Sequence, residues 1–249
     1  MKTGFIIVML LALSAIFIGA EEVPSANDKF LIAKFDFDKE GPIFLSDSSG
    51  KGSSIIPGSN ITRSAKGKNG GALSYIPRTS AEDSLSELNL GVQPKSGSFS
   101  LSAWIKMRSP SPTLTNDMYI ITNQNFFLRY NVDIAERGFQ FGIQTDKGWM
   151  QVITDPKIAY PEKNRWYFIQ AGFDGEEIKL IINGKEAGKK DVLGNFNMPS
   201  SFTIGACAWN NNLSMEGNFL MDELCVYDAP IQETSSTQGV PNSTAQESK

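Results

Sequence analysis

The chain has 249 residues, of which 41% are hydrophobic and 20% are charged, and its formal net charge is −4. These proportions are typical of a chain with a large core and exclude global disorder. The sequence has no long run of Lys and Arg, so we expect no nucleic-acid partner. It also has no His and only two Cys, which excludes Ser-His-Asp and Cys-His catalysis and the usual zinc sites.

Residues 1–20 have the pattern of a secretory signal peptide. Lys2 provides a positive charge, an apolar run extends from Phe5 to Phe17, and the segment ends in the small residues Gly and Ala. An uncleaved anchor helix is the alternative, but the run is shorter than the roughly 20 residues that span a bilayer. We therefore expect cleavage, a secreted or periplasmic location, and no membrane insertion afterwards.

Between residues 21 and 231, apolar and polar side chains alternate with the period of two that is typical of β-strands. In Phe99–Met107, the Phe, Leu, Ala, Ile and Met side chains share one face, and Ser, Trp and Lys share the other. The dipeptides Asp174-Gly175 and Asn183-Gly184 favour tight hairpin turns. The predicted strands are, in chain order, Phe99–Met107, 138–144, Trp166–Phe173, Ile178–Ile182, 185–190, Phe202–Ala208 and Phe219–Tyr227.

Many short strands without a long amphipathic helix predict one all-β domain over residues 21–231. Its expected architecture is an antiparallel two-sheet jelly-roll β-sandwich. Residues 232–249 are rich in Ser, Thr and Gln and have too few apolar side chains to offset the entropy of ordering. We therefore expect a disordered tail there.

Several motifs occur in an order that resembles a known family. They are AKFDFDKEG, SDSSGKG, GKNGGALSY, FSLSAWIKM, RWYFIQAGFDGEEIKLIINGKEAG, FTIGACAWNN and FLMDELCVYDAPI. Together they resemble the laminin-G-like group of the concanavalin A-like lectin/glucanase superfamily, over Phe30 to Ile231. The resemblance implies one concave and one convex sheet, with the concave face and its rim loops as the usual binding surface.

The resemblance also implies a calcium site, because members of this superfamily often carry one and calcium prefers oxygen ligands. Asp36, Asp38 and Asp47 match acids of the opening motifs, Asp222 matches the closing Asp-Glu, and Gly71 could supply a carbonyl. The alternatives are an ordinary turn at Asp47, a solvated acid at Asp36 and a hydrogen-bonding role for Asp222.

Two tryptophans near predicted loops are candidates for stacking on sugar rings. Trp149 follows a turn, and Trp209 precedes Asn210 and Asn211, whose amides could bind sugar hydroxyls. The alternative is that each indole closes over the core, since an exposed aromatic patch is informative only when it is contiguous.

The other two tryptophans, Trp104 and Trp166, lie within predicted strands. The resemblance places them at positions used for packing, and large aromatic side chains dominate core burial. We therefore expect both to lie in the core.

Glycoside hydrolysis needs two carboxylates about 5.5 Å apart for retention. Related laminarinase-like enzymes carry an E-x-D-x-x-E motif on one strand, and this sequence has none. Asp222 and Glu223 are consecutive, so they should point to opposite faces of a strand. Asp174 and Glu177 belong to a predicted hairpin turn. We therefore expect no catalytic site.

Cys207 and Cys225 lie in the last two predicted strands of a chain that we expect to be exported. An even number of cysteines in that environment favours a disulfide. Two separate buried thiols are the alternative.

These observations predict a non-catalytic binding module that recognises an extracellular glycan or glycoconjugate, with a calcium ion. The alternative is a matrix or adhesion module that binds a cell-surface or matrix protein. A hydrolase or lyase with an unfamiliar acid pair is the third hypothesis.

Overall fold

The computed structural model describes residues 28–108, 117–131, 137–155, 162–207 and 215–231. The predicted signal peptide and the predicted tail both lie outside these ranges. No helix within the described ranges is long and apolar enough to cross a membrane.

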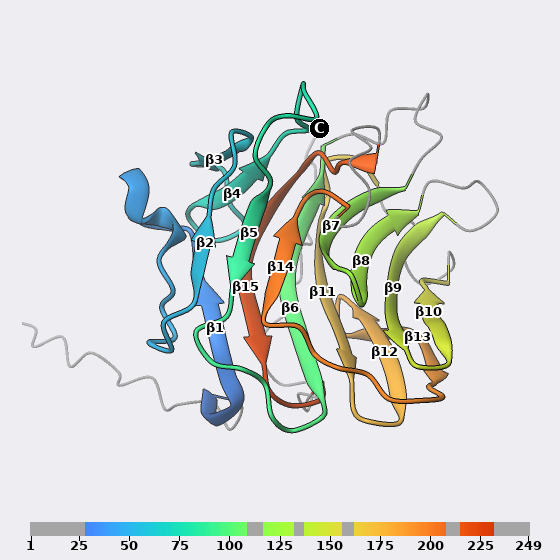
Figure 1. The fold of residues 1–249 in the computed structure, drawn as a ribbon. Helices are drawn as coiled ribbons and strands as arrows, with labels where there is room; N and C mark the ends of the chain where they lie inside the picture. Colours follow the sequence, from blue (N-terminus) through green and yellow to red (C-terminus); the bar gives the residue numbers. More distant parts are fainter. Residues whose placement is uncertain (1–27, 109–116, 132–136, 156–161, 208–214, 232–249) are drawn as a thin grey trace, which may run out of the picture.

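The regular secondary structure of the described residues consists of two short 3-10 helices and the strands that follow (Figure 1). The 3-10 helices are η1 (Asp28–Phe30) and η2 (Gly41–Leu45). The strands are β1 (Leu31–Phe35), β2 (Ser54–Ile56), β3 (Ile61–Ser64), β4 (Ala72–Tyr75), β5 (Ser86–Asn89), β6 (Phe99–Met107), β7 (Met118–Asn123), β8 (Phe126–Asn131), β9 (Gly138–Thr145), β10 (Gly148–Ile153), β11 (Trp166–Phe173), β12 (Glu177–Ile182), β13 (Lys185–Asp191), β14 (Ser201–Ile204) and β15 (Phe219–Tyr227).

The strands form two antiparallel sheets, which confirms the predicted two-sheet sandwich. Sheet A has the order β13-β12-β11-β6-β15-β4-β3, and β1 also pairs with β15. Sheet B has the order β10-β9-β8-β7-β14-β5-β2. Strands far apart in the sequence, such as β6 and β15, are therefore neighbours in the middle of sheet A.

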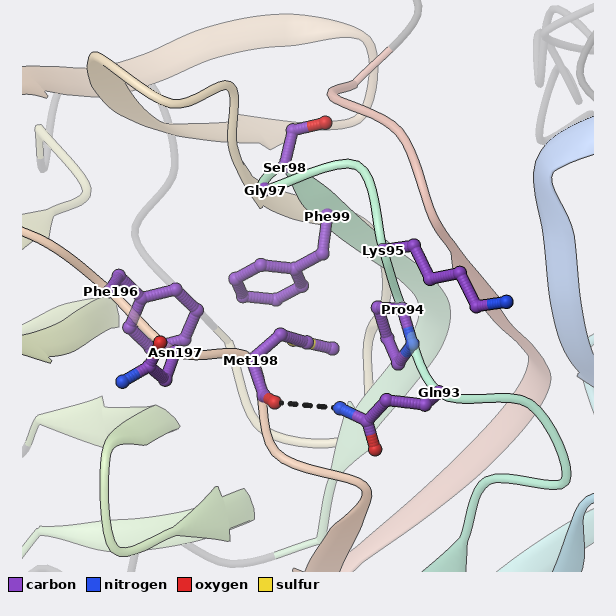
Figure 2. A pocket seen from close by; sticks show the side chains of 9 residues that line it. All are labelled: Gln93, Pro94, Lys95, Gly97, Ser98, Phe99, Phe196, Asn197 and Met198. Carbon is purple, nitrogen blue, oxygen red and sulfur yellow. Dashed lines mark hydrogen bonds between the residues drawn. The ribbon is translucent and has the colours of Figure 1, made fainter.

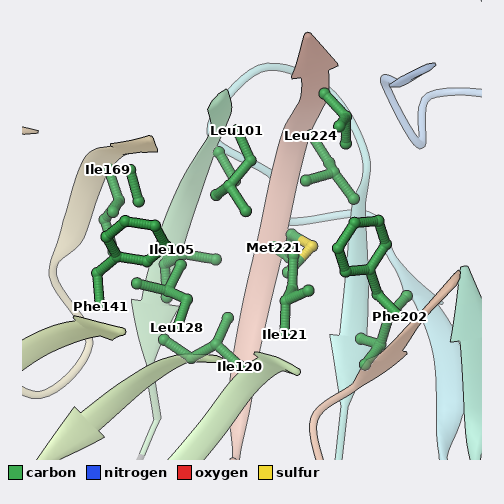
Figure 3. Packing of buried hydrophobic residues seen from close by; sticks show 14 of the residues in the cluster. Leu101, Ile105, Ile120, Ile121, Leu128, Phe141, Ile169, Phe202, Met221 and Leu224 are labelled. Atoms are coloured by element: carbon green, nitrogen blue, oxygen red, sulfur yellow. The ribbon is translucent and has the colours of Figure 1, made fainter. Parts of the chain in front are cut away.

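The core lies between the two sheets and follows from the alternation in the sequence. Every second side chain of β6, from Phe99 to Met107, is at most 1% exposed. Figure 3 shows Leu101 and Ile105 of this strand packing in the same cluster as Leu128 and Phe141 of sheet B. The opposite side chains of each strand therefore face outward, and they form the two outer faces of the sandwich.

The predicted hairpins are confirmed. The register of β11 with β12 and of β12 with β13 is antiparallel. Asn183 and Gly184 both have positive φ, at 51° and 77°, as the tight turn requires.

The predicted disulfide is absent, because its two cysteines lie on opposite sides of the molecule. Cys225 belongs to sheet A and alternates with Leu224 and Val226, which point into the core. Cys207 follows β14 of sheet B and packs with Tyr119 and Phe127 in a small cluster that is separate from the main core. Both thiols are buried, and the full thickness of the sandwich separates them, so no disulfide joins them.

Candidate functional site

A row of aromatic side chains lies on the outer face of sheet B. Trp149 of β10 contacts Phe127 of β8 with ring centroids 5.2 Å apart, and Phe127 meets Tyr119 of β7 edge-on at 6.4 Å. Trp149 is 40% exposed, whereas the other two rings are buried. We call these three residues the sheet B platform. It presents one solvent-exposed indole on a base of buried rings.

Gly142 makes room for the Phe127 ring on the outer face of sheet B. It pairs with Phe127 across β8 and β9. A Cβ atom at Gly142 would lie 2.5 Å from Cζ of the Phe127 ring. The bare backbone of β9 therefore lets Phe127 lie flat on the sheet, where it supports Trp149.

Polar groups surround the platform on the same face. The guanidinium of Arg129 lies over the Phe127 ring, donates to Gln140 Oε1 at 2.6 Å and pairs with Asp117 at 2.5 Å. The charge of Arg129 is therefore balanced. Gln151, two residues after Trp149, is exposed on the same side of β10.

Of the residues predicted to contact a glycan, Trp149 lies on the platform. Trp209, Asn210 and Asn211 lie outside the described residues. Cys207 and Met215, which flank that segment, both pack in the cluster of Tyr119 and Phe127. Phe127 and Tyr119 were not predicted, because Trp149 reaches Phe127 across the intervening strand β9, which the sequence pattern does not reveal.

A separate hollow of about 340 Å³ lies between the segments that precede β6 and β14. Figure 2 shows Phe99, Phe196 and Met198 around it, while the Lys95 side chain points away. The two phenyl rings stack at 5.4 Å. Its lining includes no carboxylate, so the hollow has no acid pair for glycoside hydrolysis.

Asp222 and Glu223 do not point to opposite faces, contrary to the expectation. A register shift interrupts the pairing of β15 there, and Glu223 has a φ of 50°. Met221 and Leu224, on either side, both belong to the core. The bulge therefore places both acids on the outer side of sheet A.

Three of the predicted calcium ligands come together beside this bulge. Asp222 accepts hydrogen bonds from the main-chain N–H groups of Lys68 and Asn69, at 2.8 and 2.9 Å. Asp38 accepts one from Gly71 at 2.7 Å. Burial raises the pKa of Asp222, and the charge of Asp38 raises it further. The two acids therefore repel each other while both bind the loop from Lys68 to Gly71.

The other two predicted ligands have different roles. Asp47 accepts hydrogen bonds from Lys34, Ser49 and Ser53 at 2.8–3.0 Å, which fills both of its oxygens. Burial alone would raise the pKa of Asp47, but these bonds together lower it. Asp36 accepts a single turn hydrogen bond from the N–H of Asp38. In the described part of the chain, no three acidic or cysteine side chains form a group that could hold a metal ion.

The prediction that Trp104 and Trp166 lie in the core is wrong. Both are partly exposed, and both project from the outer face of sheet A. Each ring has a lysine ammonium above it, as described below.

A laminin G-type family model, described as the concanavalin A-like lectin/glucanases superfamily, matches residues 80–235. No curated protein matches the chain.

Solved structures similar to the chain include two toxin domains and one enzyme module. The binding domain of Paraclostridial Mosquitocidal Protein 1 has a TM-score of 0.64 and 13% identity, over 83% of this chain and 50% of that one. The binding domain of botulinum neurotoxin DC, in complex with rat synaptotagmin II, has a TM-score of 0.62 and 14% identity, over 84% and 50%. Domain 4 of AbnA, a GH43 extracellular arabinanase from Geobacillus stearothermophilus in complex with arabinotriose, has a TM-score of 0.57 and 20% identity, over 82% and 95%.

The chain thus spans about half the length of the two toxin domains and nearly all of the arabinanase domain. At these identities the likeness shows the fold alone, a two-sheet β-sandwich of the concanavalin A-like type.

Proposed function

Because the chain belongs to the concanavalin A-like lectin/glucanase superfamily, we propose that it is a non-catalytic carbohydrate-binding module that acts outside the cytoplasm. The extracytoplasmic location rests on the signal-peptide pattern of residues 1–20. The absence of a catalytic role is supported by the similar structures, which are binding domains.

The exposed indole of Trp149 carries this proposal. A sugar ring has an apolar C–H face that can stack on an indole. Trp149 is supported from below by Phe127, so the ligand would find the ring already in place. The exposed amide of Gln151 could bind the hydroxyl groups at the edge of the sugar. Arabinotriose in the similar arabinanase domain is consistent with an oligosaccharide ligand.

We expect Trp149→Ala to weaken glycan binding by about tenfold or more, because stacking on the indole is lost. The measurement is an array of neutral glycans and polysaccharides, followed by titration calorimetry with the best ligand. Ile56→Ala removes an exposed apolar side chain from β2, at the other edge of sheet B from Trp149, and is the control, with unchanged affinity expected. A blank array would overturn the proposal and favour a protein surface as the ligand, which is the kind of partner that the similar neurotoxin domain binds.

We further propose that a calcium ion binds beside Asp38 and Asp222, the two predicted carboxylate ligands that lie together. A cation there would offset the repulsion between these acids, and main-chain oxygens would have to complete its coordination.

Calcium is expected to raise the melting temperature by several degrees relative to EDTA. Asp38→Asn should abolish that difference, whereas Asp191→Asn, an exposed acid on β13, should preserve it. Equal melting temperatures of the unmodified protein in calcium and in EDTA would exclude the ion.

A further inference from the structure

The outer face of sheet A carries an aromatic patch of its own. Trp104 of β6 pairs with Phe168 of β11, and their rings lie 5.2 Å apart. Trp166 pairs with Lys106 two residues further along the same two strands, on the same face. These strands are central in sheet A, so the patch lies in the middle of an outer face.

Cations lie over and beside these rings. The ammonium of Lys68 is 4.6 Å from the ring centroid of Trp104, and that of Lys106 is 4.9 Å from the ring centroid of Trp166. Attraction between a cation and an aromatic ring fixes the position of an otherwise flexible lysine. Both ammonium groups are therefore held in place at the surface.

Two further cations, Lys66 and Arg108, belong to the same cluster. Burial lowers the pKa of Lys106, and the nearby charges of Arg108 and Lys66 lower it further. Arg108 donates to Ser74 and to the carbonyl of Phe219, but its buried Nε has no hydrogen-bond partner.

The four cations have no carboxylate partner in an ion pair among the described residues. Asp222 pairs with Trp104 in the sheet, but it is fully buried and already accepts three main-chain N–H groups. Lysines near the other edge of sheet A do have carboxylate partners: Lys179 of β12 and Lys189 of β13 both pair with Glu177. These four cations therefore form a local cluster of positive charge on a chain whose net charge is −4.

We propose that Lys66, Lys68, Lys106 and Arg108 form a second binding site, which takes the carboxylate or sulfate groups of an acidic polysaccharide. Charge complementarity identifies the ligand as an anion. The cations come from the loop between β3 and β4, from β6 and from the residue after β6, and this spread suits a polymer with repeated charges. An acidic peptide fits less well. β6 and β11 are already paired on both sides, so a peptide cannot add to them as a strand and would lose its main-chain hydrogen bonds.

This site is independent of the sheet B platform, because the two lie on opposite outer faces of the sandwich. Neutral sugars would bind through Trp149, and acidic chains through the lysines above Trp104 and Trp166. Failure of one proposal therefore leaves the other open to test.

The test uses affinity electrophoresis of the protein in gels that contain polygalacturonate, dextran sulfate or neutral dextran. Retardation by either acidic polymer, with none by dextran, is expected. It should weaken as salt is added, because the contacts are electrostatic. Retardation by one acidic polymer alone identifies carboxylate or sulfate as the group that is bound.

The variant K68Q/K106Q is expected to weaken this binding by about tenfold. The control K185Q/K190Q makes the same change of charge on exposed lysines of β13, away from the tryptophans, and should bind like the unmodified protein. Thermal melts verify that both variants fold. Absence of retardation, or equal losses in the two variants, would overturn the proposal. So would preferential binding to vesicles of anionic phospholipid, which would assign this face to a membrane surface.

Discussion

Replacing Glu216 by Gln is expected to lower the free energy of unfolding by about 3–5 kcal/mol, because it removes the partner of a buried cation. Glu216 pairs with Arg78 at 2.7 Å, and both side chains are at most 2% exposed. Glu216 also accepts hydrogen bonds from the hydroxyl of Tyr75 and from the N–H of Arg78, both at 2.8 Å. The neutral amide would remove the buried carboxylate that faces the charge of Arg78.

The matched control is Glu162→Gln, which breaks an ion pair with Arg165 that is 58–62% exposed. An exposed pair contributes little, so the control should lose less than about 1 kcal/mol. Denaturant unfolding of both variants measures the difference. Losses of similar size in the two variants would show that the buried pair contributes no more than a surface pair does.

This buried network also connects the two sheets. Glu216 immediately follows Met215, which packs against Tyr119 and Phe127, and it forms an isolated bridge with Tyr119 itself. The same carboxylate reaches Tyr75 in β4 of sheet A. Glu216 therefore connects the edge of the sheet B platform with the opposite sheet.

The strands could be predicted from the sequence, since alternation alone identifies β6, β11 and β15 with their observed bounds. The same alternation also places Trp104 with Ser100 and Ser102, on the face opposite the core. The expectation that Trp104 is buried was wrong, because the period of the strand, and not the size of the side chain, decides which face a residue occupies. The cation clusters on sheet A could not be predicted, because Lys68 reaches Trp104 from a distant turn.

The candidate calcium residues show a second limit of the sequence pattern. The turn at Asp47 can be inferred from the sequence, because the hydrogen bonds that Asp47 accepts from Ser49 and Ser53 are local. The bulge at Glu223 was not foreseen, because no Gly or Pro marks it. Since side chains alternate only in an unbroken strand, one extra residue moved Glu223 to the same side as Asp222. The sequence also does not show which sheet each strand joins. Cys225 lies in sheet A and Cys207 follows a strand of sheet B, so the predicted disulfide does not form.

Replacing Gly205 by Ala is expected to lower the free energy of unfolding by about 3 kcal/mol or more, from backbone strain and overpacking together. Gly205 directly follows β14 and has a φ of 80°, which L side chains rarely adopt. A Cβ atom there would overlap the ring of Tyr75, which is fully buried and stacks on Phe219 at 5.4 Å. Tyr75 would have to move, and its hydrogen bond to Glu216 would break with it.

Gly184 separates the two causes, because it has nearly the same backbone conformation without the crowding. Its φ is 77°, and no atom lies within 4 Å of a Cβ built on it. Gly184→Ala should therefore lose only about 1 kcal/mol, from backbone strain alone. The difference between the two variants measures the overlap with Tyr75. The double variant Gly205→Ala/Glu216→Gln tests whether Tyr75 couples the two sites. We expect its loss in free energy of unfolding to be smaller than the sum of the two single losses, because both changes break the same hydrogen bond. A loss equal to that sum would show that Tyr75 does not couple them.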